Sequence, residues 1–319
     1  MRAVVVPSHG DSSALRVTEV PDPVPGPGEV LVDVAASGVN FIDVYHREGR
    51  YPLPPPRVVG SEGAGTVSAV GEGVTDIVVG DRVGWVNILG SYAEKAVIPA
   101  ARAIVLPEGL SPEVAAAVLL QGLTAHYLTH STHEIQPGDD VLVHAAAGGM
   151  GLLLTQVAKL RGARVVGTVS TAEKEKLARE AGADEVFGYD GFAERVKALT
   201  GSGVHVVYDG VGAATFEGSL ASLRPRGLLA LYGAASGPVP PFDLQRLNQA
   251  GGLFVTRPSL GWYTSTREEL LSRADELLGW VASGALKVHI FQRYALEDAR
   301  RAHDDLEARR TTGKVLLIP

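Results

Sequence analysis

Short apolar runs dominate the first hundred residues of the chain, and turn-forming residues bound each of them. Residues 30–34 and 65–70 are rich in β-branched side chains, as is typical of β-strands. Residues 1–6 are also strand-like and are followed at once by Pro7, which disfavours a secretory signal. The proline-rich segment 52–56 is expected to form a stiff loop. These runs predict a compact, barrel-like β domain that extends to about residue 120.

Beyond that point the pattern changes to strands that alternate with helices. Ser111, Pro112 and Glu113 have the order of an N-cap, a first helical position and a first-turn acid. This alternation predicts βαβ units, and hence a doubly wound parallel sheet with helices on both faces. The expected strands are 140–144, 163–168, 185–187, 204–208, 227–232, 252–256 and a closing strand at 314–318. The expected helices are 149–161, 171–181, 193–199, 215–223, 267–283 and 299–310.

Composition narrows the class of protein. The chain has 319 residues, which suggests two domains at roughly 150 residues each. It is 45% hydrophobic, and it has no apolar run near the roughly 18 residues that a membrane helix needs. The net charge of -7 argues against a nucleic-acid partner, and the lack of cysteine excludes disulfides and thiolate chemistry. We therefore expect a cytoplasmic enzyme without a membrane or nucleic-acid partner.

The strongest chemical signal is the segment 141–151, V-L-V-H-A-A-A-G-G-M-G. An apolar strand enters a loop of small residues, and that loop opens a helix. A dinucleotide needs this arrangement because small side chains let the pyrophosphate approach the N–H groups at the helix start. The A-x-x-G-x-x-G spacing alone is weak, but its place inside a βαβ unit strengthens it. The alternative is a tight connection whose small residues serve only packing.

The end of the next strand indicates which dinucleotide is bound. An NAD site expects an acidic residue there to bind the ribose 2′-hydroxyl. Here residues 167–171 contain no acidic residue. The first acidic residue after the strand is Glu173, and Lys174 and Lys176 lie close to it in the sequence. Hydroxyl and ammonium groups would bind a 2′-phosphate that a carboxylate would repel. The segment favours NADPH, with Lys174 as the phosphate ligand; the alternative is that both lysines are solvated helix surface.

Six separate motifs in the sequence are similar to those of a known protein family. They are G-V-N-F-I-D-V-Y at 38–45, G-S-E-G-A-G at 60–65, G-D-R-V at 80–83, the loop at 145–151, V-Y-D-G-V-G at 207–212 and F-V-T-R-P-S at 254–259. The chain resembles the medium-chain dehydrogenase/reductase superfamily, and within it the zinc-free quinone oxidoreductases related to zeta-crystallin. The resemblance covers essentially the whole length. It implies a Rossmann domain at 122–262 that binds NADPH, and a discontinuous GroES-like β-barrel-type catalytic domain formed by 1–121 and 263–319.

The resemblance also implies which chemistry is possible. Alcohol dehydrogenases of this superfamily have a zinc-ligand cysteine where this chain has Asn40, and a zinc-ligand histidine where it has Ser61. Without a Lewis acid a simple ketone is hard to polarise, so a quinone or a carbonyl-conjugated alkene fits better. We expect an NADPH-dependent quinone reductase without a metal. The alternatives are an enoyl or enone reductase of the same superfamily, or a non-catalytic NADPH-binding sensor or structural protein.

The site residues follow from the same resemblance. Asn40, Tyr45 and Tyr51 are the expected catalytic residues: the first two orient or hydrogen-bond the acceptor, and Tyr51 closes over it. The alternative for Tyr45 is that it only packs against the acceptor ring while water delivers the proton. The expected cofactor-binding residues are Asn40, Asp43, Tyr45, Thr124, Gly148, Gly149, Met150, Gly151, Ser170, Lys174, Tyr189, Gly233, Ala234, Phe254, Val255 and Thr256.

Two further features bear on assembly and on histidine chemistry. The apolar edge strand near Phe254 needs covering, which favours a homodimer that pairs this strand with its copy; the alternative is burial under the C-terminal segment. His126, His130 and His133 recur at helical spacing and predict an exposed polar face rather than a metal site. His144 is expected to be a core or supporting histidine rather than a proton shuttle.

Overall fold

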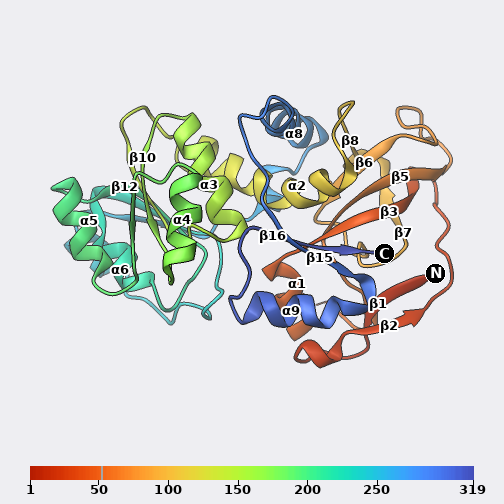
Figure 1. Ribbon diagram of the computed structural model, residues 1–319, viewed down its shortest axis with the longest axis horizontal. Helices are drawn as coiled ribbons and strands as arrows, with labels where there is room; N and C mark the ends of the chain where they lie inside the picture. Colours follow the sequence, from red (N-terminus) through yellow and green to blue (C-terminus); the bar gives the residue numbers. More distant parts are fainter. Residues whose placement is uncertain (52) are drawn as a thin grey trace. The chain divides into compact units, whose positions relative to one another are not determined.

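The computed structural model describes residues 1–51 and 53–319 (Figure 1). Pro52, the first residue of the expected proline-rich loop, lies outside the described residues. The chain divides into two compact units. Unit 1 comprises Met1–Leu123 and Thr264–Pro319, and unit 2 comprises Thr124–Tyr263. The catalytic role expected for the first and the NADPH-binding role expected for the second stay predictions.

Unit 1 is built around a large, mainly antiparallel sheet in the order β15-β16-β3-β5-β6-β8, with β7 paired to β3; a smaller sheet has the order β2-β1-β4. In the large sheet Val315 on β16 pairs with Val39 on β3, so the end of the chain completes a sheet that its beginning started. The strands of unit 1, over both sheets, are β1 (Arg2–Val6), β2 (Arg16–Glu19), β3 (Glu29–Val39), β4 (Arg57–Val58), β5 (Glu62–Val70), β6 (Arg82–Val86), β7 (Lys95–Pro99), β8 (Ile104–Val105), β15 (Ile290–Ala295) and β16 (Lys314–Ile318).

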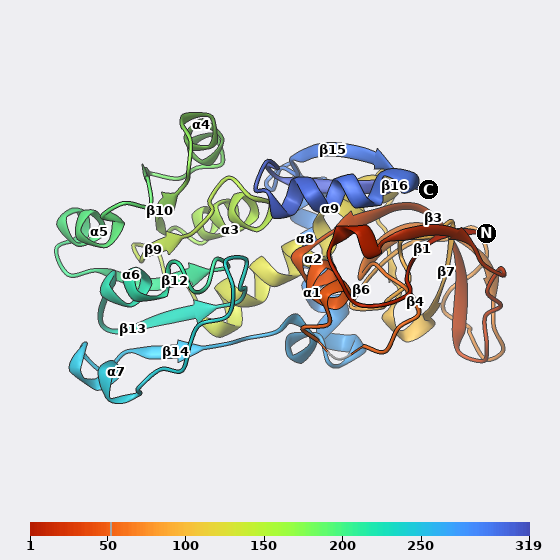
Figure 2. The ribbon, with the colours of Figure 1, turned by 90° about the horizontal axis from the view of Figure 1, so that it is seen from below.

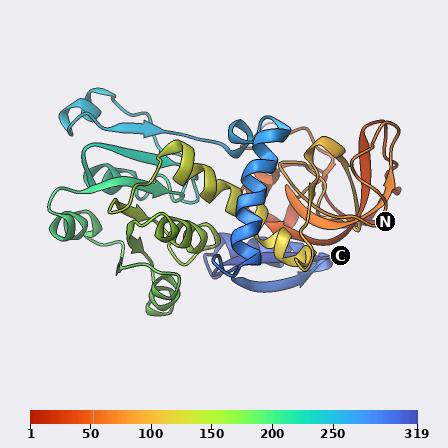
Figure 3. The ribbon, with the colours of Figure 1, turned by 90° about the horizontal axis from the view of Figure 1, so that it is seen from above.

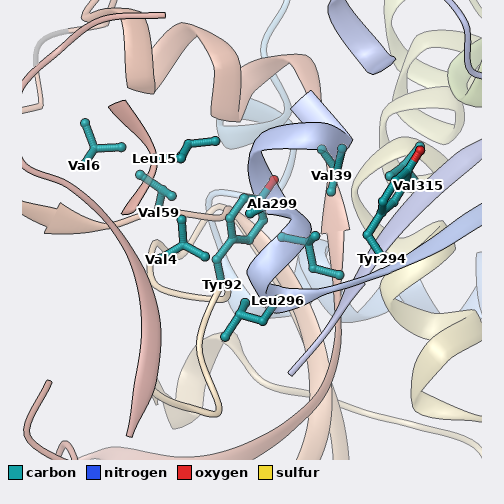
Figure 4. Close-up of a cluster of buried hydrophobic side chains, with 12 residues drawn as sticks. Val4, Val6, Leu15, Val39, Val59, Tyr92, Tyr294, Leu296, Ala299 and Val315 are labelled. Carbon is teal, nitrogen blue, oxygen red and sulfur yellow. The ribbon is translucent and has the colours of Figure 1, made fainter. Parts of the chain in front are cut away.

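The helices of unit 1 include α1 (Phe41–Glu48), α9 (Ala299–Glu307) and the long helix α8 (Arg267–Ala282), which is blue in Figure 3. Helix α2 (Pro112–Tyr127) contains residues of both units. A buried cluster packs β1 and β16 against α9 (Figure 4), and it includes Val4, Val6, Leu15, Val39, Val59, Tyr92, Tyr294, Leu296, Ala299 and Val315. Short 3-10 turns occur at Ser12–Ala14, Ala100–Arg102, Leu260–Tyr263 and Leu296–Asp298, and a π-helical segment at Leu128–Thr132.

Unit 2 is a parallel sheet in the order β11-β10-β9-β12-β13-β14. The chain starts at β9, adds strands on one side and then reverses to the other, which places a topological switch point at the carboxyl end of β9. Figure 2 shows β13 and β14 side by side, at the edge of the sheet opposite β11. The strands are β9 (Asp140–Val143), β10 (Arg164–Thr168), β11 (Glu185–Phe187), β12 (Val204–Asp209), β13 (Leu223–Leu231) and β14 (Phe254–Thr256).

Helices cover both faces of this sheet, as the alternating pattern predicted. Figures 1 and 2 show α3 and α4 on one side of the strands and α5 and α6 on the other. Leu142, Val207 and Leu229 are fully buried in the core because strands covered on both faces need apolar side chains on both. The helices are α3 (Gly149–Leu160), α4 (Ala172–Glu180), α5 (Phe192–Thr200), α6 (Phe216–Ala221) and α7 (Gln245–Gln249).

The fold class predicted from the sequence is confirmed: a doubly wound parallel sheet accompanies a β-rich domain. The boundaries differ in detail. Strand β13 begins at Leu223, where the sequence predicted the end of a helix, and β15 was not predicted at all. None of the helices in residues 1–51 and 53–319 combines the length and apolar character that a membrane crossing requires.

Candidate active site

The small-residue loop connects β9 to α3 as expected. Ala145 turns the chain with a φ of 51°, and Gly148 is the N-cap of α3. A Cβ on Gly151 would lie 2.2 Å from the carbonyl oxygen of Ala145, so this glycine lets the helix approach its own loop closely. Packing therefore accounts for Gly151. The first turn of α3 still points its N–H groups out of the helix start, where an anionic pyrophosphate would bind.

The residues expected at the 2′-phosphate lie at the ends of the two neighbouring strands. Ser170 is exposed just beyond β10, and Lys174 lies in the first turn of α4. The N-cap Thr171 accepts a hydrogen bond from the Lys174 backbone N–H at 3.3 Å, which fixes the start of that helix. Tyr189 follows β11, and its hydroxyl accepts a hydrogen bond from the Ala145 N–H at 3.2 Å. The structure thus joins Tyr189 to the dinucleotide loop.

A buried polar chain lies beneath this loop. His144 Nδ1 is 2.7 Å from Thr168 Oγ1, and its Nε2 is 2.9 Å from Ser219 Oγ. Ser219 Oγ donates in turn to Asp209 Oδ2 at 2.8 Å. Burial lowers the pKa of His144 to about 4, so the ring is neutral near pH 7. His144 is confirmed as a buried core histidine, and its supporting role stays a prediction. Its link to the Asp209 carboxylate through Ser219 was not foreseen.

The remaining cofactor candidates of unit 2 lie on three segments. Thr124 is buried in α2, and Gly233 and Ala234 follow β13. The backbone N–H of Gly233 donates to the carbonyl oxygen of Asp209 at 3.4 Å, which ties this turn to the end of β12. On β14, Phe254 is 61% exposed and Val255 is 38% exposed.

The three spaced histidines do not form the expected exposed face. His126 is buried, and its ring stacks on that of His130 at 4.2 Å. His133 lies beyond the π-helical segment, and its Nε2 is 3.0 Å from Asp139 Oδ2. The prediction of an exposed polar face was wrong because the face that His126 and His130 share is buried at His126, and His133 lies beyond the helix.

In unit 1 the start of α1 is held by a buried polar network that we call the Asn40 network: Asn40, Glu62, Gln121 and Lys314. Asn40 Nδ2 donates to Glu62 Oε2 at 2.8 Å and to the Gly38 carbonyl at 3.2 Å. Its Oδ1 accepts hydrogen bonds from Lys314 Nζ at 2.7 Å and from Gln121 Nε2 at 3.2 Å. Both donors and both acceptor positions of the amide are therefore occupied within unit 1.

Lys314 and Glu62 form a direct ion pair in this network. Lys314 Nζ lies 2.5 Å from Glu62 Oε2, and both side chains are buried. Glu62 Oε1 also accepts the backbone N–H of Leu120 at 2.7 Å. Gly38 makes room for the pair, since a Cβ there would lie 2.2 Å from Glu62 Oε2 and 2.7 Å from Lys314 Cε. Sequence reasoning missed the pair; the only local signal was the acid of the G-S-E motif.

Asp43 is the centre of a second buried chain of hydrogen bonds. Its carboxylate accepts the backbone N–H of Asn40 at 3.0 Å, Ser61 Oγ at 2.7 Å and Tyr92 OH at 3.0 Å. Full burial raises the pKa of Asp43 to about 6 even though these three hydrogen bonds act in the opposite direction. Since both oxygens have partners within unit 1, the bonds assign Asp43 to holding the start of α1. Its expected cofactor contact stays a prediction.

The chain of hydrogen bonds around Asp43 continues from Tyr92 to residues that the sequence analysis did not single out. Tyr92 OH is 3.2 Å from His303 Nε2, and Arg47 Nη1 is 3.1 Å from His303 Nδ1. Arg47 also donates to Glu307 Oε1 at 2.6 Å. Burial, with the Arg47 guanidinium beside the ring, lowers the pKa of His303 to about 3. Helix α9 is thereby joined to α1.

The two expected catalytic tyrosines lie together. The ring centroids of Tyr45 and Tyr51 are 6.0 Å apart; Tyr45 is 7% exposed and Tyr51 is 41% exposed. The Arg50 guanidinium lies 5.2 Å from the Tyr45 ring centroid. His46 is next to this pair, with its ring 6.1 Å from that of Tyr51. An aromatic surface with one accessible phenol ring suits a flat conjugated acceptor.

The comparisons agree with this architecture. Residues 26–108 match the family model for the alcohol dehydrogenase GroES-like domain, and residues 149–274 match the model for zinc-binding dehydrogenases. The quinone oxidoreductase of Pseudomonas aeruginosa is 48% identical over 317 residues, which cover 98% of each chain. The 2-haloacrylate reductase of a Burkholderia species is 42% identical over 328 residues, covering 99% of this chain and 98% of that one.

A solved structure gives the same result in three dimensions. The crystal structure of Escherichia coli quinone oxidoreductase complexed with NADPH is 46% identical and superposes with a TM-score of 0.98, covering 100% of both chains. A GroES-like domain and a dehydrogenase nucleotide domain in one chain define the medium-chain dehydrogenase/reductase superfamily. Within that superfamily, the chain belongs to the quinone oxidoreductase family.

Proposed function

We propose that this protein is an NADPH-dependent quinone reductase that works without zinc. The observation that supports it most directly is the phosphate-binding end of unit 2. There the start of α3, the hydroxyl of Ser170 and the ammonium of Lys174 follow two adjacent parallel strands. Pyrophosphate and 2′-phosphate are the two anionic parts of NADPH, and this arrangement has a binding group for each. The family relative solved with NADPH supports the same cofactor.

The proposed roles on the cofactor follow from position. The loop and first turn of α3, Gly148, Gly149, Met150 and Gly151, would bind the pyrophosphate. Ser170, Lys174 and Tyr189 would bind the 2′-phosphate, and NADPH, when bound, supplies the hydride for the reduction. Residues proposed to line the nicotinamide half are Asn40, Asp43, Tyr45, Thr124, Gly233, Ala234, Phe254, Val255 and Thr256.

The acceptor is proposed to bind against the tyrosine pair. Tyr51 is accessible and would cover a flat ring, while Tyr45 would pack below it or donate its phenolic hydrogen to the developing oxyanion. The amide of Asn40 has four partners in unit 1, so we assign it the orientation of α1, and with it of Tyr45. Water remains the alternative proton donor.

The side chains at the two zinc-ligand positions do not suit zinc. Asn40 offers an amide and Ser61 a hydroxyl, whereas protein zinc sites use thiolate, imidazole and carboxylate ligands. Both side chains are also bound elsewhere, Asn40 to Glu62 and Lys314, and Ser61 to Asp43. The proposed reaction therefore relies on an acceptor that takes up hydride without Lewis-acid activation.

A second candidate function has an observation in its favour. The Burkholderia relative is named for reduction of a 2-haloacrylate, in which the alkene is conjugated to a carboxylate. An electron-poor alkene, like a quinone, accepts hydride without a metal. We keep enone or enoate reduction as the alternative, and a panel of quinone and alkene acceptors separates the two.

We also propose a homodimer through the edge of the unit 2 sheet. Strand β14 pairs with β13 on one side, and among the described strands nothing pairs with its other side. Its exposed Phe254 and Val255 would be covered by the same strand of a second copy. Light scattering after size exclusion tests this: Phe254→Asp should shift the mass from dimer to monomer. The cytoplasmic location expected from the sequence stays a prediction.

The test of function is oxidation of NADPH and of NADH, side by side, by EDTA-treated protein with a naphthoquinone acceptor. We expect quinone-dependent turnover that prefers NADPH and survives chelation. Lys174→Ala should weaken NADPH binding about 10- to 150-fold, the worth of one charge-assisted hydrogen bond, and leave NADH nearly unchanged. Lys176→Ala is the matched control, since that exposed lysine is only 3.9 Å from Glu180 one turn away. Equal losses for both nucleotides would remove Lys174 from the phosphate site.

A further inference from the structure

We propose that His144 is a positioning residue for nucleotide selectivity: it holds the 2′-phosphate-binding segments in place and so determines the preference for NADPH over NADH. The inference rests on the proposed function. Its basis is the buried chain Thr168–His144–Ser219–Asp209, which we call the His144 relay. All four side chains are fully buried. None of them touches the phosphate in this proposal; they act through the segments they hold.

The direction of every hydrogen bond in the relay is determined. The Asp209 carboxylate only accepts, and Ser219 Oγ uses its one hydrogen on Asp209 Oδ2. Ser219 must then accept a hydrogen from His144 Nε2. A neutral imidazole carries one hydrogen, so Nδ1 is the acceptor and Thr168 Oγ1 donates to it. The relay therefore runs from Thr168 to Asp209 in one sense and uses both ring nitrogens.

Asp209 anchors the far end of the relay. Its Oδ1 accepts the backbone N–H groups of Val211 at 2.8 Å and Gly212 at 3.0 Å, and its Oδ2 also accepts Thr215 Oγ1 at 2.7 Å. Four donors thus surround one carboxylate. Because these hydrogen bonds hold the loop after β12 in one position, they also hold Ser219 and His144 in one position.

The near end of the relay lies next to the expected 2′-phosphate ligands. Thr168 is the last residue of β10, two positions before Ser170. The ring of Tyr189 is nearly parallel to that of His144, with the centroids 6.2 Å apart, and the Tyr189 hydroxyl accepts a hydrogen bond from the Ala145 N–H. One buried ring therefore hydrogen-bonds the segment that carries Ser170 and lies beside the ring of Tyr189. Loss of the ring disturbs both sides of the same phosphate site.

The effect should fall on one nucleotide. Removal of His144 leaves the Thr168 and Ser219 hydroxyls without their partner in a site that is fully buried. The end of β10 is then free to shift, and charge-assisted hydrogen bonds to a phosphate depend steeply on position. NADH has no 2′-phosphate, and its pyrophosphate depends on the start of α3. A change at the end of β10 should therefore weaken NADPH much more than NADH.

The experiment measures dissociation constants for NADPH and NADH by nicotinamide fluorescence in the full-length protein. We compare wild type with His144→Phe, which fills the space without hydrogen bonds, and with the milder Thr168→Val. Both variants should weaken NADPH about 10-fold or more and NADH less than about 2-fold, with kcat at saturating NADPH unchanged. Tyr208→Phe is the matched control, because it removes another buried side-chain hydrogen bond of the same sheet, to the Leu128 carbonyl. The backbone carbonyl of Tyr208 accepts the His144 N–H at 3.2 Å, and this substitution leaves that bond and the side chains of the relay in place.

The outcomes are separable. Equal weakening of both nucleotides in His144→Phe and Thr168→Val, or the same loss of selectivity in Tyr208→Phe, would overturn the proposal and make the relay a general stabiliser. Thr168→Val keeps the test open if His144→Phe does not fold. If the wild type itself binds neither nucleotide, the proposed function fails instead. Unchanged selectivity in both relay variants also overturns the proposal.

Discussion

Each unit of the molecule contains a buried polar cluster, and the two clusters are built on different principles. The His144 relay of unit 2 contains one neutral ring, two hydroxyls and one carboxylate that hydrogen-bond donors surround. The Asn40 network of unit 1 contains a buried ammonium against a buried carboxylate. Substitution of one hydroxyl in the His144 relay removes one hydrogen bond, and the fold loses only the stability which that bond contributes. An ion pair that loses one partner leaves an uncompensated buried charge, which costs far more.

The clusters also differ in what they join. The relay connects the carboxyl ends of β9, β10 and β12, which the parallel topology brings together in any case. The Asn40 network connects β5 and α2 to Lys314 at the start of the last strand, 252 residues from Glu62. In unit 2 the parallel sheet already places the carboxyl ends of these strands next to one another, and the relay only fixes them more firmly. In unit 1 it helps to join the two ends of the chain.

The largest expected effect follows from the ion pair. Lys314→Met should lower the free energy of unfolding by about 3–5 kcal/mol, because Glu62 is left buried without its cation. Denaturant unfolding followed by fluorescence measures this. Adding Glu62→Gln should recover much of the loss, since the pair is then replaced by neutral groups.

Lys95→Met is the control for the loss of a lysine. It breaks a 2.7 Å pair with Asp22 whose partners are both exposed to solvent, so its effect on the free energy of unfolding should be small. A loss for Lys314→Met no larger than this, or no recovery in the double variant, would contradict the contrast between the two clusters.

The second prediction concerns pH. His144 of the relay and Asp43, which lies in unit 1 outside the Asn40 network, have pKa shifts with opposite effects on stability. Burial holds the pKa of His144 near 4 against 6.5 for an unfolded histidine, so the folded state resists protonation. Stability is then lost as pH falls from 6.5 towards 4, by about 3 kcal/mol for a shift of this size. Burial raises the pKa of Asp43 to about 6 from 3.8, so in that case stability is lost as pH rises through the same range.

Single variants isolate each contribution from the other titrating groups. The stability gap between wild type and His144→Phe should narrow by about 3 kcal/mol between pH 7 and pH 4. Relative to wild type, Asp43→Asn should instead gain about the same amount as pH rises from 4 to 7. The charged or titratable neighbours are Asp209 for His144, and Lys314 and Tyr92 for Asp43. A pH-independent gap for either variant would refute that assignment.

The same difference explains how much could be predicted from the sequence. The loop at 145–151, the helix expected over 171–181 and the closing strand at 314–318 are local patterns, and the structure contains all three, with α4 at Ala172–Glu180. His144 could be assigned a supporting role because it directly follows a buried strand. These predictions need only the periodicity and the turn chemistry of neighbouring residues.

The Asn40 network could not be found this way. Asn40, Glu62 and Lys314 are brought together only when β16 pairs with β3, and no sequence pattern relates residues more than 250 positions apart. A buried charge also looks, in sequence, like an exposed one. The order of hydrogen bonds from Asp43 through Tyr92 to His303 is similarly non-local. In unit 1, what remained hidden is therefore the set of contacts that depends on pairing of the last strand with β3.

The smallest effect is the sharpest test of the claim that unit 2 carries the phosphate site. Thr171 and Thr266 are equivalent N-caps in the two units: each accepts a backbone N–H three residues on, at 3.3 and 3.1 Å. Replacement by alanine should cost about 1 kcal/mol of unfolding free energy in both cases. Only Thr171→Ala loosens the turn of α4 that carries Lys174, so only this variant should weaken NADPH, by a few fold, while NADH is unaffected. Equal nucleotide affinities in the two variants would mean that the start of α4 does not bind the 2′-phosphate.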